Sequence, residues 1–171
     1  VGSSVILNGD AGGLRDIAIC KYDLAGTLVW VKQVAGAGDD QGRRIRIDKQ
    51  GNLVFTGIFY ATPDFDPATG TIFNLSSNGW GDIFTCKWSA AGAFIWANAT
   101  GGIDSDEAYG LGIDSASNVY VTGRFQRATD FDPGAGVFPL SPIGLLDGFL
   151  VKYNASGAFS WAKQIACNAS V

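Results

Sequence analysis

Short apolar stretches alternate along the chain with turns rich in glycine, asparagine and aspartate. Within the stretches, apolar residues stand at every second position or run together, a spacing typical of β-strands. The turns between paired stretches are short enough to join two neighbouring strands into a hairpin. The pattern predicts four hairpins, which pair residues 43–48 with 53–60, 82–88 with 93–98, 109–114 with 118–125, and 147–153 with 158–164.

The strand pattern repeats with a period of 65–66 residues. The segment DIAICKY at 16–22 returns as DIFTCKW at 82–88 and as DGFLVKY at 147–153. A turn glycine and a tryptophan recur at the same shift: Gly26, Gly92 and Gly157, then Trp30, Trp96 and Trp161. Such a chain is an array of one structural unit, in which each unit buries its faces against its neighbours.

The strand that opens the later hairpin of each unit is apolar on both faces. In the first unit Ala18, Cys20 and Tyr22 share one face, whereas Ile17 and Ile19 share the other. A sheet that is apolar on both faces has to lie between two others. Radial packing of four-stranded antiparallel sheets, the β-propeller arrangement, meets that demand. A stacked solenoid is the alternative, but its repeats are shorter, at roughly 20–45 residues.

We therefore predict an all-β chain of about two and a half propeller blades, each of four antiparallel strands. Residues 16–33 would form the outer hairpin of one blade, 43–98 a full blade and 109–165 another. A propeller closes with roughly four to eight blades, so this piece cannot close a ring by itself. The remaining blades of a parent chain, or further copies of this chain, are expected to cover its ends. The absence of methionine agrees with a segment of a larger propeller.

The composition narrows the chemistry that the chain can perform. It contains no histidine, which excludes a Ser-His-Asp triad and histidine-ligated zinc. The net charge of -4 argues against nucleic acid as a partner, because nucleic-acid binding requires a basic surface. No apolar run approaches the roughly eighteen residues of a membrane span, so no membrane insertion is expected. Of the 16 acidic residues only Glu107 is glutamate, and aspartate favours turns and strand starts.

Three sets of repeated motifs resemble a known family. They are GNLVFTGIF and SNVYVTGRF, DFDPATG and DFDPGAG, and DIFTCKWSAAGAFIWA and DGFLVKYNASGAFSWA. In this order they are similar to the bacterial seven-bladed β-propeller repeat called SBBP, and the resemblance covers essentially the whole chain. It implies a propeller domain of a large secreted or cell-surface bacterial protein, generally without an assigned enzymatic activity. It carries no catalytic motif over to this sequence.

Residues that recur in every unit are expected to build the blades, whereas a unique site has to break the repeat. The strand-start aspartates are predicted to accept hydrogen bonds from neighbouring backbone amides. The recurring lysines are expected to be their blade-to-blade or solvent-facing partners, and the recurring tryptophans to pack on the outer strand. The aspartates and lysines are Asp16, Asp82 and Asp147, then Lys21, Lys87 and Lys152.

The three cysteines make an odd count. Cys20 and Cys86 occupy the same position of the repeat, and we predict that both are buried apolar residues. Cys167 lies close to the end of the sequence and is either a free thiol or an intermolecular link.

The two Asp-Phe-Asp-Pro loops are candidates for a calcium ion. Asp64 and Asp66, like Asp130 and Asp132, stand at alternate positions before a proline, which brings their oxygens to one side of a tight loop. Such oxygen ligands suit Ca²⁺, although the loops lack the third acidic position and the bidentate glutamate of a full calcium loop. The alternative is that the four carboxylates cap turns by bonding backbone amides, while the intervening phenylalanine anchors each loop.

Three arginines break the repeat on the strand expected nearest the propeller channel. The next unit has a tyrosine and two glycines in place of Arg43, Arg44 and Arg46. Guanidinium groups there could bind an anionic ligand through paired hydrogen bonds. The alternative is that they pair with Asp39, Asp40 or carboxylates of other blades.

Trp80 also breaks the repeat, and with Tyr60 it could stack on a sugar ring or pack onto its own blade. Three functions therefore stay open. The first is a non-enzymatic interaction or adhesion scaffold that binds a surface glycan or protein, and the second is a lectin-like, carbohydrate-binding propeller. The third is a lyase or glycosidase that uses a carboxylate pair. Against the third, the visible pairs recur in both blades, whereas a catalytic acid and base need unequal environments. No cofactor other than calcium is expected.

Overall fold

The computed structural model describes residue 7 and residues 14–166, and the fold is stated for these residues. Their regular structure is entirely β. The strands are β1 (Ile17–Tyr22), β2 (Leu28–Val34), β3 (Gln41–Ile47), β4 (Leu53–Phe59), β5 (Asp82–Trp88), β6 (Phe94–Thr100), β7 (Glu107–Ile113), β8 (Val119–Phe125), β9 (Thr129–Asp130), β10 (Pro139–Leu140), β11 (Asp147–Tyr153) and β12 (Phe159–Ile165). This part of the chain holds no helix that is long and apolar enough to cross a membrane.

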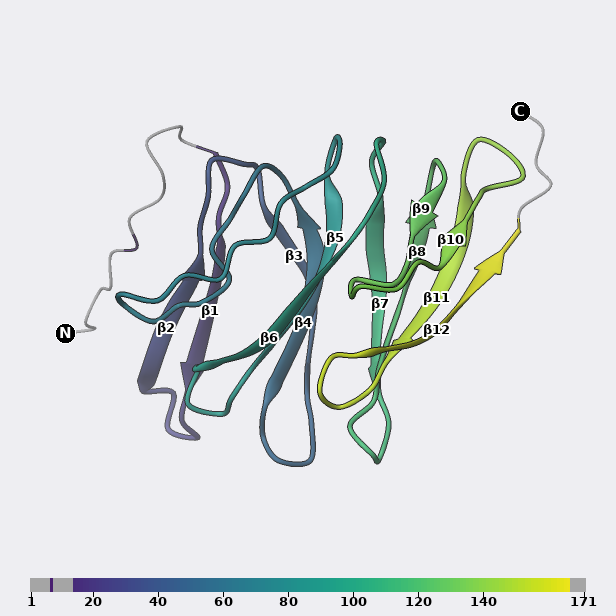
Figure 1. Ribbon diagram of the computed structural model, residues 1–171. Helices are drawn as coiled ribbons and strands as arrows, with labels where there is room; N and C mark the ends of the chain where they lie inside the picture. Colours follow the sequence, from purple (N-terminus) through teal and green to yellow (C-terminus); the bar gives the residue numbers. More distant parts are fainter. Residues whose placement is uncertain (1–6, 8–13, 167–171) are drawn as a thin grey trace.

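The strands form three antiparallel layers that stand side by side without closing into a ring (Figure 1). We call them hairpin A (β1 and β2), sheet B (order β3-β4-β5-β6) and sheet C (order β7-β8-β11-β12). Sheets B and C are each four-stranded, as propeller blades are. The predicted fold class is therefore confirmed: the described chain is all-β and consists of antiparallel sheets consistent with propeller blades.

The hairpins follow the predicted pairing. In sheet B, β4 pairs with β3 and β5, and β5 also pairs with β6, while sheet C repeats this order with β8 and β11. The sequence did not predict β9 and β10, a short antiparallel pair that joins Asp130 to Pro139. This pair closes the second Asp-Phe-Asp-Pro loop.

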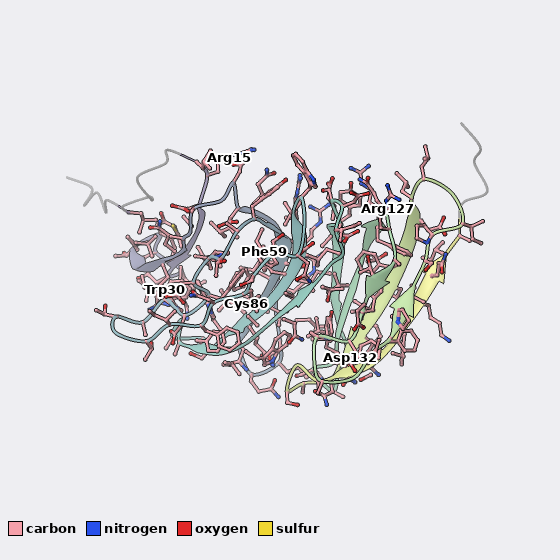
Figure 2. All side chains as sticks on the ribbon, turned by 45° about the horizontal axis from the view of Figure 1, so that its top comes forward. Arg15, Trp30, Phe59, Cys86, Arg127 and Asp132 are labelled. Atoms are coloured by element: carbon pink, nitrogen blue, oxygen red, sulfur yellow. The ribbon has the colours of Figure 1, made fainter. Side chains whose placement is uncertain are left out.

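The alternation of side chains along the central strands sends each face of sheet B into a different core. Phe55 and Phe84 face hairpin A, where they pack with Ile17 and the other buried residues of that core. Val54 and Ile83 belong to the second core, which sheet B shares with sheet C. Figure 2 shows Cys86 and Phe59 inside this array of side chains. The prediction that both faces are buried holds for the central strands β4 and β5, but in β1 only the face of Ile17 and Ile19 is buried, whereas Ala18 and Cys20 are exposed.

Aromatic side chains dominate the first core. The Phe55 ring meets the Trp88 ring edge to face, with 4.8 Å between centroids, and it meets the Phe84 ring at 5.7 Å. Pairs of this geometry each stabilise a fold by about 0.5–1.5 kcal/mol beyond the area that they bury. The Trp88 Nε1–H also donates to the Phe65 carbonyl at 3.0 Å, which ties the Asp-Phe-Asp-Pro loop to the sheet.

The outer-strand tryptophans pack across the joint between one layer and the next. Trp96 of sheet B donates from Nε1 to the Ala155 carbonyl of sheet C at 3.3 Å. Its ring lies so close to Gly157 that a Cβ there would fall 2.7 Å from Cδ2 of the ring. At the preceding joint a Cβ on Gly92 of sheet B would meet the Lys32 side chain of hairpin A at 2.6 Å and the Trp30 ring at 3.3 Å. The predicted packing role is confirmed for Trp30 and Trp96, which contact the turn of the following blade, and Trp161 packs edge to face on Tyr120 of its own sheet.

The recurring aspartates and lysines also have structural roles. Asp82 accepts a hydrogen bond from the Asn78 amide, and Asp147 accepts one from the Ile143 amide at 2.9 Å, as predicted. Lys87 forms a buried ion pair with Asp48, 2.9 Å from Nζ to Oδ2. Asp16 likewise accepts from the Gly36 amide. The lysines differ from one another: Lys21 donates to the Ala90 carbonyl of sheet B, and Lys152 lies over the Tyr120 ring. The prediction that they pair with the strand-start aspartates is wrong for Lys87, whose partner is Asp48.

The prediction for the cysteines is half right. Cys86 is buried, but Cys20 is exposed, and both are free thiols. The cause is the position of each strand in the array: the face of β5 that carries Cys86 packs on hairpin A, whereas the equivalent face of β1 has no described layer against it. Cys167 lies outside the described residues.

Candidate functional site

Strand β3 is the first strand of sheet B, and its neighbour in the adjacent layer is β7, the first strand of sheet C. Most of its side chains, including all three arginines, are exposed. A register shift between Gly42 and Arg44 marks a bulge at Arg43, so this arginine stands out of the regular alternation. Arg44 and Arg46 follow two residues apart and share one face of the strand.

Arg43 takes part in a polar cluster that joins sheets B and C. Its Nη2 lies 3.7 Å from Oε2 of Glu107, which also pairs with Arg124 at 2.5 Å and accepts a hydrogen bond from the Tyr109 hydroxyl at 2.9 Å. Burial alone would raise the pKa of Glu107, but these hydrogen bonds and charges bring it below its usual value. The lowered pKa keeps Glu107 ionised at neutral pH, and its carboxylate lies within ion-pair distance of Arg43.

The prediction that the arginines pair with Asp39 or Asp40 is wrong, whereas the predicted pairing with a carboxylate of another blade is confirmed for Arg43. Asp39 does not pair with them, because it forms a bidentate interaction with Arg15, at 2.6 Å from Nε and 2.5 Å from Nη2. Asp40 is buried and accepts a hydrogen bond from the Tyr60 amide at 2.9 Å. A carboxylate of the neighbouring blade, Glu107, is the partner of Arg43.

Arg44 and Arg46 have no carboxylate partner in the part of the chain that the structure describes. Arg44 Nη1 donates to the Arg43 carbonyl at 2.8 Å, and Arg46 Nη1 donates to the Ile45 carbonyl at 3.0 Å. Within the described residues neither guanidinium makes an ion pair. Two guanidinium groups on one exposed strand face can accept an anionic group of a partner through paired hydrogen bonds.

The two aromatic candidates differ in exposure. Trp80 is 77% exposed on the loop before β5, so it does not pack onto its own blade. Tyr60 is half-buried, and its ring lies beside Gly81, where a Cβ would fall 2.8 Å from Cε1. Tyr60 thus supports the loop that carries Trp80 and places the two aromatic residues in one region.

The Asp-Phe-Asp-Pro loops show the geometry of capped turns. Asp64 Oδ1 accepts from the amides of Asp66 and Phe73 at 2.9 and 2.8 Å. The second loop repeats this with Asp130, which accepts from Asp132 and Phe138 at 3.0 and 2.8 Å, while Asp66 and Asp132 accept from Ala68 and Gly134. Phe65 and Phe131 are fully buried anchors. Among the described residues, no three His, Cys, Asp or Glu side chains gather as a metal cluster.

Sequence reasoning missed a buried carboxylate at the joint between sheets B and C. Asp106 accepts from the amides of Gly102 and Gln126 at 2.7 and 3.1 Å. Burial, with the nearby charge of Asp82 adding to it, raises the pKa of Asp106 to about 6. The signal was present in the sequence, because Asp40 occupies the same repeat position and makes the equivalent bond. The other residues missed, Tyr109 and Arg124, do not recur and gave no such signal.

Comparisons with known proteins agree with a repeat chain of this kind. No family model matches the sequence. The chain is 29% identical over 181 residues to the "Uncharacterized WD repeat-containing protein L264" of Acanthamoeba polyphaga mimivirus, an alignment that covers 92% of this chain and 13% of that protein. It is 27% identical over 145 residues to "Regulatory protein FlaEY" of Caulobacter vibrioides, covering 85% of this chain and 15% of that protein.

The first relative supports a propeller-type repeat fold, since WD repeats build propellers of four-stranded blades. The resemblance to the SBBP repeat stays a prediction. The chain spans only about an eighth to a seventh of the lengths of these two relatives, so their activities as whole proteins do not transfer to it.

Proposed function

We propose that this chain is a non-enzymatic, β-propeller-type scaffold that binds other proteins through the exposed face of β3. The observation that carries the proposal is the pair Arg44 and Arg46, two exposed guanidinium groups without an acidic partner in the described chain. The next unit has glycine at both positions, so the pair is not required to build a blade. WD-repeat propellers commonly act as platforms for protein interactions, which is consistent with the likeness to one such protein.

The proposal extends to a secreted or cell-surface protein, with adhesion as the context. This part rests on the motif resemblance to the SBBP repeat alone. An enzymatic role is less well supported, because the recurring carboxylates of Asp64 and Asp130 bond backbone amides in equivalent ways. Two equivalent carboxylates do not provide the unequal acid and base of a glycosidase.

Binding of an acidic peptide tests the arginine surface. A fluorescent peptide rich in glutamate should bind the chain with an affinity that falls as salt rises, since exposed charge pairs are screened. The double variant Arg44→Gln, Arg46→Gln should weaken binding about tenfold or more. Arg127→Gln removes one exposed positive charge that pairs with Asp104 elsewhere, and it serves as the control. Equal binding by the chain and the double variant would refute the role of this surface.

A second candidate function is carbohydrate binding, favoured by the 77% exposure of Trp80 beside the Tyr60-supported loop. An exposed aromatic face stacks on the apolar side of a sugar ring. A glycan array probed with the chain and with Trp80→Ala distinguishes this function from the first. Glycan signals that vanish in Trp80→Ala and persist in the double arginine variant would support a lectin-like role, whereas an empty array would exclude it for the glycans displayed.

A further inference from the structure

A hollow of about 650 Å³ lies among the loops at the upper end of sheet C in Figure 1. Three segments bound it: the link from β6 to β7, the residues that follow β8, and the loop that leads into β11. Hollows of roughly 300–1,000 Å³ have the size of small-molecule sites. The lining includes three polar and three apolar side chains, namely Asp104, Gln126 and Arg127, then Pro142, Leu145 and Leu146.

The hollow breaks the repeat, as a unique site has to. In sheet B the counterparts of Gln126 and Leu146 are Tyr60 and Gly81, and there the Tyr60 ring lies beside Gly81. The other four positions also change from sheet B to sheet C: Gly38 to Asp104, Ala61 to Arg127, Ser77 to Pro142 and Trp80 to Leu145. None of these side chains in sheet C is therefore required to build a blade.

The joint between sheets B and C shows how a further blade would meet loops of this kind. The segment after β6 packs on Gly79, where a Cβ would fall 2.3 Å from the Ile103 carbonyl oxygen. Trp80 follows Gly79 in the chain and is still 77% exposed. Gly144 and Leu145 are the counterparts of these two residues. A segment that packed on Gly144 in the same way would therefore leave Leu145 accessible.

Arg127 and Asp104 give the hollow one positive and one negative group side by side. Nε of Arg127 donates to Oδ2 of Asp104 at 2.7 Å. Within the described residues, the two terminal nitrogens of Arg127 and Oδ1 of Asp104 have no other hydrogen-bond or ion-pair partner. A purely anionic ligand would be repelled by Asp104, and a purely cationic one by Arg127. A ligand that carries both charges fits the pair best.

We propose that this hollow binds an α-amino acid with an apolar side chain. The ligand carboxylate would pair with the terminal nitrogens of Arg127, and its ammonium group would donate to Oδ1 of Asp104, because charge-assisted hydrogen bonds are the strong ones. Its side chain would lie against Leu145 and Leu146, which are 76% and 37% exposed, and would remove their apolar surface from water. The inference goes beyond the proposed function, because it uses neither the arginine surface of β3 nor Trp80.

Nuclear magnetic resonance of the full, isotopically labelled chain tests the site, with L-phenylalanine as the probe. Two relatives of the probe are its controls: N-acetylphenylalanine keeps only the carboxylate charge, and phenylalanine amide keeps only the ammonium charge. We expect saturable shifts of backbone amides within residues 126–128 and 141–146 on addition of phenylalanine. Each control should bind about tenfold more weakly or worse, because it loses one of the two charge-assisted contacts.

Variants assign the contacts to single side chains. Arg127→Gln should weaken phenylalanine binding about tenfold or more. Leu145→Ser should weaken it as well, because it removes apolar contact area. Val137→Ser is the matched control, since Val137 is 77% exposed in sheet C but does not line the hollow. The amide signals of the remaining residues show that each variant keeps the fold.

The two proposals fail independently. The double variant Arg44→Gln, Arg46→Gln should bind phenylalanine like the wild type, and Arg127→Gln should still bind the acidic peptide. Equal binding of phenylalanine and N-acetylphenylalanine would contradict the two-charge site. Saturable shifts confined to residues away from the hollow, or no saturable shift up to the solubility limit of phenylalanine, would overturn the site and leave the arginine surface to its own test.

Discussion

Single aspartates in the turns act as acceptors for backbone amides, and Asp64 is the clearest case. Its Oδ1 accepts two such bonds, which fix the loop above Phe65. Asp64→Ala should therefore lower the free energy of unfolding by about 1–3 kcal/mol, because two backbone amides lose their acceptor. Urea denaturation measures this change. Asp104→Ala removes a surface aspartate that pairs with Arg127, and it should cost less than about 1 kcal/mol.

The same capping geometry makes a prediction about calcium. Because the loop oxygens already accept backbone amides, Ca²⁺ and a chelator should give the same Tm for the wild-type chain. Calcium that binds only the folded loops would raise the Tm by mass action. A calcium-dependent rise that disappears in Asp64→Ala would contradict the turn-capping account and support the alternative that Asp64, Asp66, Asp130 and Asp132 hold the ion.

Asp106 gives the chain a pH dependence with a definite sign. Its pKa in the folded chain is about 6, raised from 3.8, so folding favours the protonated carboxyl. The stabilisation is complete below about pH 4 and is lost as the pH rises through about 6. The chain should gain about 1 kcal/mol of unfolding free energy when the pH falls from 7.5 to 5. Asp39 and Glu107 have lowered pKa values, so they act in the opposite direction. The chain loses their contribution to stability only at lower pH, where these carboxylates become protonated.

Urea melts of the wild type and Asp106→Asn at the two pH values measure this effect. The variant cannot titrate at this position, so its stability should change little across the same range. A wild type that is less stable at pH 5 than at pH 7.5, or a variant that keeps the full wild-type slope, would show that Asp106 is not the group responsible.

The structural role of a residue was predictable from the sequence where that residue recurs in every repeat unit. The strand-start aspartates and the outer tryptophans recur, and recurrence alone indicates a structural role. Glu107 and Arg124 do not recur, and their pairing with Arg43 depends on how two sheets are placed in space. The exposure of Cys20 was missed for a related reason, because a side chain is buried only where another layer covers its face.

At the scale of elements, Trp96 packs on the turn glycine Gly157 at the joint between sheets B and C. Gly157 has a φ of 87°, a left-handed conformation that favours glycine, and its missing Cβ leaves room for the Trp96 ring. Gly26 has a similar φ of 78° in the equivalent turn, but a Cβ there would meet nothing within 4 Å. The two glycines therefore share a backbone conformation and differ only in whether a tryptophan ring packs against them.

This difference makes a matched pair of variants. Gly26→Ala should cost only the strain of a left-handed alanine, about 1 kcal/mol. Gly157→Ala should cost clearly more, because the added methyl group also displaces the Trp96 ring from the joint. Thermal and urea unfolding of the two variants give the comparison. Equal losses of stability would show that the tryptophan joint contributes nothing beyond the backbone of the turn.

Most elements could be predicted because alternation and turn residues are local signals. The ten long strands lie at or within a few residues of the expected places. The short β9 and β10 were not predictable, since each has two residues and forms only when the loop folds back from Asp130 to Pro139. A pair of that length is set by loop closure and carries no alternation of its own.

For the molecule as a whole, the repeat predicted the kind of architecture. The period and the two apolar faces indicated blades packed against one another, and two cores of that kind are present. The sequence also indicated that β1 and β2 form an outer hairpin, because residues 16–33 match only the later half of the repeat.

Hydrogen exchange read by mass spectrometry tests the central claim most directly, since it reports the pairing of each strand in one experiment. In an array of antiparallel blades, segments 53–59, 82–88, 119–125 and 147–153 should exchange slowest, because these strands are paired on both edges. Segments 17–22 and 41–47 should exchange much faster, because they lie at edges. Protection of 17–22 equal to that of 82–88, or no protection in any strand, would contradict the account.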